Sequence, residues 1–269
     1  MNTIHEPVLL KEIVRELHIK NQGKYIDATL GAGGYTKAIL SAGGTVLGID
    51  ADESMIQIAK ENLKDTNAKI AHGNFENIKK IAEENGFMNA DGIVFDLGVS
   101  NFHFMDDTRG FSFRNPEADL DMRLDVNSQG LKASDLLNAL REDQLKEMFG
   151  NNISRRITEY RKIKKFEKVS DFLSLFPSKK PGERIHPATK AFLALRIAVN
   201  SELDNLKEAL PEAMEILKRG GRLVVVSFNS DEDRIVKEIF NSHDFVKPTS
   251  EEIERNAKSR SAILRVFEK

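Results

Sequence analysis

The chain has 269 residues, of which 40% are apolar and 30% charged, so it can bury the core of one large α/β domain or of a domain with an insertion. It contains no cysteine, which excludes disulfides, thiolate metal sites and a cysteine nucleophile. The net charge of -2 argues against a protein that coats nucleic acid, so any RNA contact must come from local patches.

The first part of the chain shows a helical pattern rather than the apolar core of a signal peptide. Residues 5–18 place four apolar side chains on one helical face, Leu9, Ile13, Val14 and Leu17. No later apolar run approaches the roughly 18 residues of a membrane span. We therefore expect a cytoplasmic protein with no membrane partner.

A strand, a glycine-rich turn and a second helix come next. Tyr25 and Ile26 enter the strand, the turn is Gly31-Ala-Gly-Gly34, and the helix begins at Tyr35. Glycines let backbone amides approach a ligand because no Cβ is in the way. A second strand then ends in Asp50, and this pattern is typical of a nucleotide pocket.

The chemistry of the ligand can be narrowed from the spacing. Asp50 follows Asp27 by 23 positions, near the roughly 20-residue offset at which such an acid binds ribose hydroxyls. NAD would be the first expectation, but Thr36 stands where the third glycine of G-x-G-x-x-G would fall, and no second nucleotide-binding half is evident. A single nucleoside such as S-adenosylmethionine therefore fits better.

S-adenosylmethionine carries an adenine that could lie near Phe75 and an ammonium group that needs acceptors such as Asp27 or Asp96. In the alternative interpretation, Asp27 and Asp52 are capping or turn carboxylates and Phe75 belongs to the core. The spacing leaves both interpretations open.

The alternation of strands and helices continues as far as residue 98. Residues 54–57 are expected to form a capping box before a helix. A strand at 68–75, a helix at 78–87 and a strand at 91–98 follow, and Asp96 lies at the carboxyl end of the last strand.

The alternation then stops. Residues 99–129 contain no long periodic run but gather aromatic and charged side chains. Helical patterns return at 131–149 and 152–176, and the basic side chains of residues 155–168 are either a solvated helix face or an RNA contact. We predict an inserted helical subdomain at 106–186 that recognises the substrate.

The remaining segments, 1–105 and 187–269, would form the main domain. A long helical pattern starts at about Ala188, is broken at Pro211 and is stopped by Gly220-Gly221. The elements after it are a strand, a helix and a last strand, at residues 222–228, 231–240 and 261–267. Apolar strands separated by helices predict an α/β fold with a central, mostly parallel sheet covered on both faces.

The sequence gives little support for a metal site or for the active site of a hydrolase. The six histidines are scattered, with no pair at metal-ligand spacing, so we expect no metal site. There is also no G-x-S-x-G elbow of a hydrolase.

Eight motifs, in chain order from about residue 5 to the end, resemble those of the bacterial 16S ribosomal RNA (cytosine-N4) methyltransferases. They are Asp27-Ala-Thr-Leu-Gly-Ala-Gly-Gly34, Asp96-Leu-Gly-Val-Ser100, Arg109-Gly-Phe-Ser-Phe113, Leu120-Asp-Met-Arg123, His186-Pro-Ala-Thr189, Ala194-Leu-Arg-Ile-Ala-Val-Asn200, the segment Ser227–Lys237, and Arg260-Ser-Ala-Ile-Leu-Arg265.

The resemblance implies a class I, Rossmann-like methyltransferase with S-adenosylmethionine as cofactor and 16S rRNA of the small ribosomal subunit as partner. It implies methylation of a cytosine amino group in the decoding region. The cofactor-binding positions that it implies are Gly33, Gly34, Tyr35, Asp50, Phe75, Asp96 and His103. Tyr35 stands where the family commonly has histidine, and His103 where it commonly has glutamine.

The amino nitrogen of cytosine is a poor nucleophile because its lone pair is delocalised, so an acceptor that holds an amino hydrogen would assist attack. Candidates for this catalytic role are Asp96, Asn101 and Asn229. Asn101 replaces a usual serine and Asn229 a usual histidine. Asn229 could equally cap the helix that begins near Asp231.

Substrate contacts can be predicted only as alternatives. Four aromatic side chains could hold a splayed-out base, although two of them are expected in the core: Phe102, Phe104, Phe111 and Phe113. Arg109, Arg123 and Arg196 would bind phosphate or form internal salt bridges. A ribose 2′-hydroxyl methyltransferase and a non-catalytic S-adenosylmethionine-binding ribosome factor stay open, as does the choice between monomer and homodimer.

Overall fold

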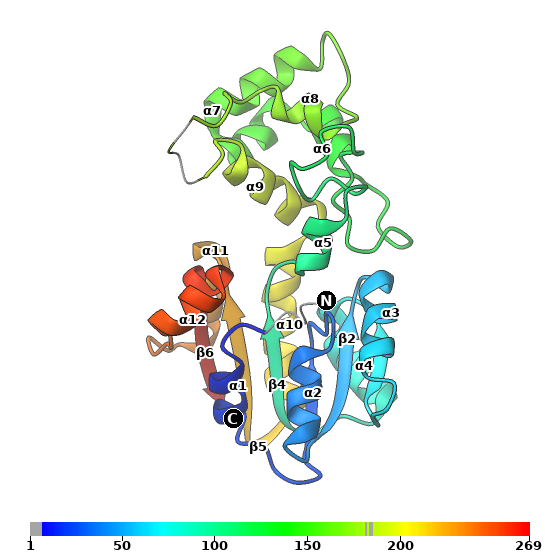
Figure 1. Cartoon of the computed structure of the whole chain (residues 1–269), viewed down its shortest axis with the longest axis vertical. Coiled ribbons are helices and arrows are strands. Elements are labelled where there is room, and N and C mark those ends of the chain that lie inside the picture. Colours follow the sequence, from blue (N-terminus) through cyan, green and yellow to red (C-terminus); the bar gives the residue numbers. More distant parts are fainter. Residues whose placement is uncertain (1–6, 181, 183–184) are drawn as a thin grey trace. The chain divides into compact units, whose positions relative to one another are not determined.

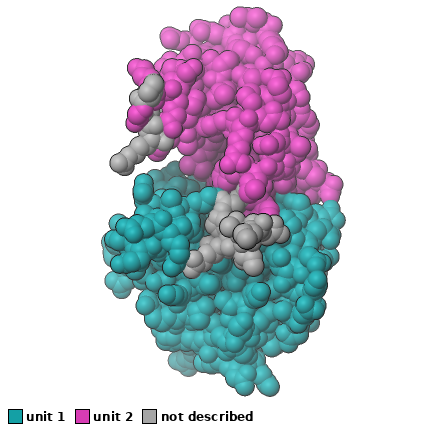
Figure 2. All heavy atoms as spheres, in the orientation of Figure 1, with its two compact units in different colours: residues 1–98, 203–269 teal, residues 99–202 magenta. Residues whose placement is uncertain are grey.

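The computed structural model describes residues 7–180, 182 and 185–269, and the chain divides into two compact units (Figures 1 and 2). Unit 1 contains residues 1–98 and 203–269, and unit 2 contains residues 99–202. No helix among the described residues is both long and apolar enough to cross a membrane.

Unit 1 is built on a six-stranded sheet with the order β3-β2-β1-β4-β5-β6 (Figure 1). The first five strands are parallel, and only β6 runs antiparallel to its neighbour β5. The strands are β1 (Lys24–Asp27), β2 (Thr45–Asp50), β3 (Lys69–His72), β4 (Ala90–Asp96), β5 (Leu217–Ser227) and β6 (Ile263–Glu268). This topology confirms the predicted α/β fold with a mostly parallel sheet.

Helices cover both faces of this sheet. They are α1 (Leu10–Glu16), α2 (Gly34–Ser41), α3 (Glu53–Asn62), α4 (Ile78–Asn85), α10 (Glu202–Ile216), α11 (Ser230–Phe240) and α12 (Ser250–Arg255), with short 3-10 helices at Phe75–Asn77 and Ala257–Ser261. The central strand β4 shows why both faces need cover. Ile93 and Phe95 enter the core cluster that includes α4, α10 and α11, while Val94 enters the opposite cluster with α1 and α2.

Three local predictions in unit 1 were wrong. Helix α3 is capped by Asp52, whose Oδ1 accepts from the Ser54 backbone at 2.7 Å, and not by a box that starts at Ser54. Pro211 lies inside α10 without ending it; the chain breaks instead at Ser201, which has φ 50°. Strand β5 begins at Leu217, before the glycine pair, because Gly220 turns at φ 73° within the strand.

Unit 2 is helical and has its own core. Its helices are α5 (Asn101–Met105), α6 (Ala133–Ala139), α7 (Glu142–Tyr160), α8 (Val169–Leu173) and α9 (Thr189–Val199). Gly150 interrupts α7 with φ 76° and ψ 171°. The unit is wider than the predicted 106–186 because Phe192 and Leu195 of α9 are buried in the same cluster as Leu137 and Phe172.

One buried asparagine ties α9 to the irregular segment that precedes α6. The Asn200 side chain donates to the Met122 carbonyl at 2.8 Å and accepts from the Leu124 backbone at 2.9 Å. Asn200 Oδ1 also accepts from Gln129 Nε2 at 3.2 Å. Because Asn200 is only 3% exposed, these bonds form away from water.

We expect Asn200→Ala to destabilise unit 2 by about 2–3 kcal/mol, since it leaves the buried Met122 carbonyl and the partly buried Leu124 amide without this partner. Hydrogen exchange of peptides from residues 99–202 measures the effect as faster exchange. Lys190→Ala, at an exposed position on the same helix, is the matched control and should change exchange little. Equal exchange in the Asn200 variant would contradict the prediction.

Candidate active site

Three carboxylates gather at the carboxyl edge of the sheet in unit 1. Asp27, Asp50 and Asp96 end the strands β1, β2 and β4, and β1 lies between the other two. The strands pair in parallel with Asp27 opposite Gly48 and Val94, so their ends reach the same edge. In open parallel sheets this edge is where ligands bind.

Asp50 shapes the glycine-rich turn. Its Oδ2 accepts from the Gly31 backbone at 2.7 Å, and its Oδ1 accepts from the Asp52 backbone at 2.9 Å. Gly31 has φ 51°, and a Cβ there would meet only the Thr29 carbonyl oxygen, at 3.9 Å. The structure thus shows how Asp50 holds the turn, while its contact with ribose hydroxyls stays a prediction.

The two predicted cofactor glycines, Gly33 and Gly34, have packing reasons to be glycine. Gly33 has φ 87°, and a Cβ on it would lie 2.8 Å from Leu63 Cδ1. A Cβ on Gly34 would overlap the Pro7 ring. The structure thus explains the residue type at both positions, while their contact with a cofactor stays a prediction.

Asp27 is fully buried and only half satisfied. Its Oδ2 accepts from the Thr36 hydroxyl at 2.7 Å and from the Thr36 backbone at 3.1 Å. Its Oδ1 is buried and has no hydrogen-bond partner among the described residues. Burial raises the pKa of Asp27 to about 6, although the bonds from Thr36 and the Thr29 backbone lower it, and the charge of Asp50 adds to the rise.

Asp96 presents a second buried oxygen of the same kind. Its backbone donates to the Thr29 hydroxyl at 2.7 Å, which joins the ends of β4 and β1. Its Oδ1 finds no hydrogen-bond partner within the described part of the chain. Burial raises the pKa of Asp96 to about 7; Tyr35 lowers it, and the charges of Asp27 and Glu232 raise it further.

These two oxygens allow a test of whether the site fits the predicted cofactor. A buried carboxylate oxygen with no donor is costly, and a cationic group removes that cost. The ammonium group of S-adenosylmethionine is such a cation. The residues at the carboxyl edge of the sheet therefore fit that cofactor.

The Tyr35 side chain is part of the unit 1 core. Its side chain is 4% exposed, and its hydroxyl donates to the Val8 carbonyl at 2.6 Å. Burial, followed by the negative charges of Asp96 and Asp27, raises the pKa of Tyr35, so the phenol stays protonated. Direct contact of Tyr35 with the cofactor stays a prediction.

Phe75 begins the 3-10 helix that follows β3. Its ring packs edge-on against the buried Phe95, with 5.6 Å between the ring centres and 73° between the ring planes. Phe75 is half-buried and packs against the core, as the core interpretation predicted. Its contact with an adenine stays a prediction.

Asn229 caps helix α11, as one of its two interpretations predicted. Its Oδ1 accepts from the Asp231 and Glu232 backbones, each at 3.0 Å. In return, Glu232 Oε2 accepts from the Phe228 backbone at 2.8 Å and from the Asn229 backbone at 3.3 Å. This capping box occupies the amide oxygen, and a catalytic role for Asn229 stays a prediction.

Two predicted site residues, Asn101 and His103, belong to α5 of unit 2. His103 is 4% exposed, and its ring centre lies 5.2 Å from that of Phe111. Ser100 caps this helix through a bond from the Phe102 backbone at 3.3 Å. The side chain of Asn101 lies outside the described residues, so both assignments stay predictions.

The four aromatic side chains of the long segment divide as expected. Phe111 is buried, and Phe113 packs on Phe192 with 4.5 Å between ring centres. Phe102 and Phe104 are 38% and 36% exposed. Two rings thus serve the core of unit 2, and two remain on its surface.

All three candidate arginines form ion pairs within unit 2. Arg123 pairs with Asp121 through two bonds of 2.7 and 2.8 Å. Arg196 pairs with Glu202 through two bonds of 2.8 Å. Arg109 donates to Asp106 at 2.7 Å. The internal salt-bridge interpretation is therefore correct for these side chains.

Three contributors to the site were not assigned by sequence reasoning. The Gly31 amide donates to Asp50. The Thr29 hydroxyl accepts from the Asp96 backbone, and the Thr36 hydroxyl donates to the Asp27 carboxylate. The threonines follow Asp27 by two and nine positions, a nearness that could have drawn attention to them. No cluster of three or more acids and histidines that could hold a metal ion occurs in the described ranges.

Comparison with known proteins identifies the family. The MraW methylase family matches residues 2–247. The ribosomal RNA small subunit methyltransferase H of Dictyoglomus thermophilum is 41% identical and aligns over 100% of this chain and 98% of its own. The proteins of that name from Coprothermobacter proteolyticus and Caldicellulosiruptor bescii are each 38% identical, over 98% of this chain and 96% and 99% of their own. The chain thus belongs to the MraW methylase family.

Proposed function

We propose that the chain transfers a methyl group from S-adenosylmethionine to the N4 amino group of a cytosine in 16S rRNA of the small ribosomal subunit. This proposal rests on the two buried carboxylate oxygens, one of Asp27 and one of Asp96, that have no hydrogen-bond partner among the described residues, in a chain of a methylase family. The similar proteins are named as methyltransferases of small-subunit ribosomal RNA. The N4 amino group of cytosine is proposed as the methyl acceptor because the sequence motifs resemble those of the cytosine-N4 methyltransferases.

The cofactor would be held by the turn and by the three strand ends. Asp50 would bind the ribose hydroxyls while it keeps Gly31 in place. Phe75 would contact the adenine, and Asp27 would hold the ammonium group. When bound, S-adenosylmethionine supplies an electrophilic methyl group on a sulfonium.

Two roles are open to Asp96. As a cofactor ligand it would bind the ammonium group together with Asp27. As a general base it would hold an amino hydrogen of the cytosine, localise the nitrogen lone pair and accept the proton released after transfer. A pKa of about 7 suits the second role, because a base works best near the ambient pH.

Unit 2 offers surface groups for RNA. Phe102 and Phe104 expose ring surface on which a splayed base could stack. Much of the basic run is already engaged, since Lys164 pairs with Asp171 and Lys168 with Asp119, each at 2.7 Å. The exposed Lys162 remains a candidate for phosphate contact.

The affinity for S-adenosylmethionine should rise with pH between about 5 and 7.5. The pKa values of Asp27 and Asp96 are raised, to about 6 and about 7, so both groups are neutral at low pH and become anionic within this range. Each proton that must leave for the cation to bind gives roughly tenfold in affinity per pH unit. Calorimetric titration at several pH values measures the slope.

5′-Methylthioadenosine is the matched control ligand, because it keeps the nucleoside and lacks the ammonium group. Its affinity should be nearly independent of pH. The variant Asp96→Asn should lose the upper part of the pH dependence for S-adenosylmethionine. Equal slopes for the two ligands would refute the assignment of the carboxylates to the ammonium group.

Methyl transfer to small ribosomal subunits should fall by about 10²–10⁴-fold in Asp96→Asn if Asp96 is the base, with the KM for the cofactor little changed. A rise in that KM with kcat retained would instead assign Asp96 to the cofactor alone. Mass spectrometry of the RNA locates the methyl group. Naked 16S rRNA and assembled subunits are compared as substrates.

Asp65→Asn, an exposed acid beyond the end of α3, is the matched control and should keep full activity. A methyl group on a ribose 2′-hydroxyl would overturn the N4 assignment. Cofactor binding by the wild type without turnover on either substrate would overturn the proposal in favour of a non-catalytic factor.

A further inference from the structure

Three consecutive residues, Pro7, Val8 and Leu9, make contacts both with the start of α2, directly after the glycine-rich turn, and with helix α12. The Val8 carbonyl accepts the hydroxyl of Tyr35 at 2.6 Å. The Leu9 backbone donates to Glu252 Oε1 at 2.7 Å, across 243 positions of sequence. Pro7 occupies the space that a side chain at residue 34 would need. We call these residues the Pro7–Leu9 segment.

The backbone of Leu9 requires an outside partner. Leu9 is fully buried and has φ 54° and ψ 31°, a left-handed conformation that side chains other than glycine rarely adopt. It precedes α1 without providing a side-chain cap. Glu252 therefore satisfies a buried amide in a strained turn.

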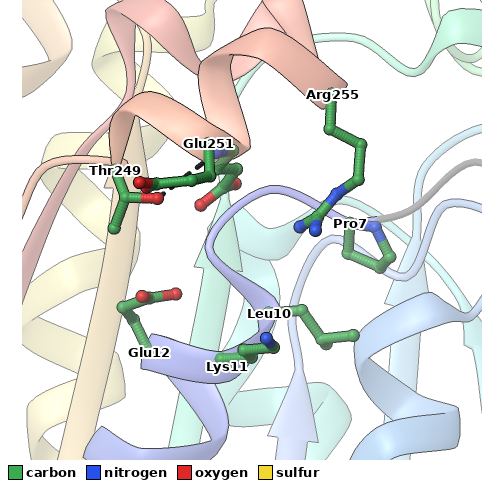
Figure 3. Close-up of a pocket in the computed structure, with 8 residues that line it drawn as sticks. Pro7, Leu10, Lys11, Glu12, Thr249, Glu251 and Arg255 are labelled. Atoms are coloured by element: carbon green, nitrogen blue, oxygen red, sulfur yellow. Dashed lines mark hydrogen bonds between the residues drawn. The ribbon is translucent and has the colours of Figure 1, made fainter.

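Glu252 is itself held in place. It is 9% exposed and lies in the first turn of α12, where its own backbone donates to the Thr249 hydroxyl at 3.2 Å. Figure 3 shows Thr249, Glu251 and Arg255 on one side of a pocket and residues of α1 on the other. The pocket holds about 250 Å³, so α12 and α1 are not closely packed there, and the bond to Leu9 bridges them.

We propose that Glu252 is a positioning residue of the cofactor site, which holds the Pro7–Leu9 segment and through it fixes the Tyr35 hydroxyl beside Asp96. This inference rests on the proposed function, because it assigns Asp96 a role with the cofactor. Glu252 acts through Leu9, Val8 and Tyr35 and does not itself touch the reacting atoms.

The hydroxyl of Tyr35 has a single hydrogen and two competing acceptors. It donates to the Val8 carbonyl, and it is also close enough to Asp96 to lower the pKa of that carboxyl, against the larger effect of burial. The position of the Val8 carbonyl thus determines how strongly the Tyr35 hydroxyl can hydrogen-bond to Asp96. The other charged groups that act on Asp96 are Asp27 and Glu232.

This geometry predicts opposite effects for two variants. In Glu252→Ala the segment loosens, the Tyr35 hydroxyl turns to Asp96, and the pH midpoint of S-adenosylmethionine binding moves down. In Tyr35→Phe the hydroxyl is absent, and the midpoint moves up. A merely structural role of Glu252 would weaken the fold without moving the midpoint of Glu252→Ala down.

The experiment measures S-adenosylmethionine affinity by calorimetry from pH 5 to 7.5, and hydrogen exchange of the Leu9 amide in the ligand-free protein. We expect Glu252→Ala to weaken binding by about tenfold near neutral pH, the equivalent of one lost interaction, and to expose the Leu9 amide to exchange. Glu252→Gln keeps an acceptor oxygen at the same reach and should restore both properties. Glu251→Ala, at a neighbouring exposed position of α12, should match the wild type.

Glu252→Asp serves as a second variant, in case the alanine variant fails to fold, because it keeps the charge and shortens the reach. It should show the same downward shift as Glu252→Ala. Unchanged affinity and midpoint in folded Glu252→Ala and Glu252→Asp, with the wild type binding the cofactor, would overturn this inference alone. A wild type that binds no S-adenosylmethionine would overturn the proposed function together with it.

Discussion

The burial of two ionisable carboxylates at one edge of a parallel sheet is the constraint on which the candidate site depends. Asp27 and Asp96 end neighbouring strands, so the sheet itself brings their like charges together. Burial raises both pKa values, the charge of Asp27 raises that of Asp96 further, and hydrogen bonds from Thr36 to Asp27 and from Tyr35 to Asp96 offset only part of this effect. Such a buried carboxyl is stable either when it is protonated or when its carboxylate pairs with a cation. A methylase with a cationic cofactor can use the first state without the cofactor and the second with it.

The part of the site that is local in sequence could be predicted. Each strand of unit 1 that contributes an acid ends in that acid, and the apolar runs before Asp27, Asp50 and Asp96 mark the ends within a few residues. The glycine turn is equally local in sequence, because glycine readily adopts a positive φ such as the 87° of Gly33, which other residues rarely adopt. Periodicity and turn chemistry carry this information without any knowledge of the fold.

The parts that depend on distant partners could not be predicted. Whether Arg196 would meet a phosphate or Glu202 depends on the break at Ser201, where a serine adopts φ 50°. The bond from Leu9 to Glu252 spans nearly the whole chain, so no local pattern signals it.

Tyr35 shows how such a distant contact can change the meaning of a local motif. The sequence places it among the cofactor positions, directly after the glycines, and the structure buries its ring in the core with the hydroxyl on Val8. A phenol with a raised pKa stays a donor throughout the working pH range, so it can hold an acceptor but cannot take up a proton. A histidine at this position would be able to exchange protons with Asp96, whereas the tyrosine can only share its hydrogen between Asp96 and the Val8 carbonyl. Under the proposed function, Asp27 and Asp96 would be the groups that change protonation beside the cofactor, and Tyr35 would act on Asp96 through a hydroxyl that the Pro7–Leu9 segment holds.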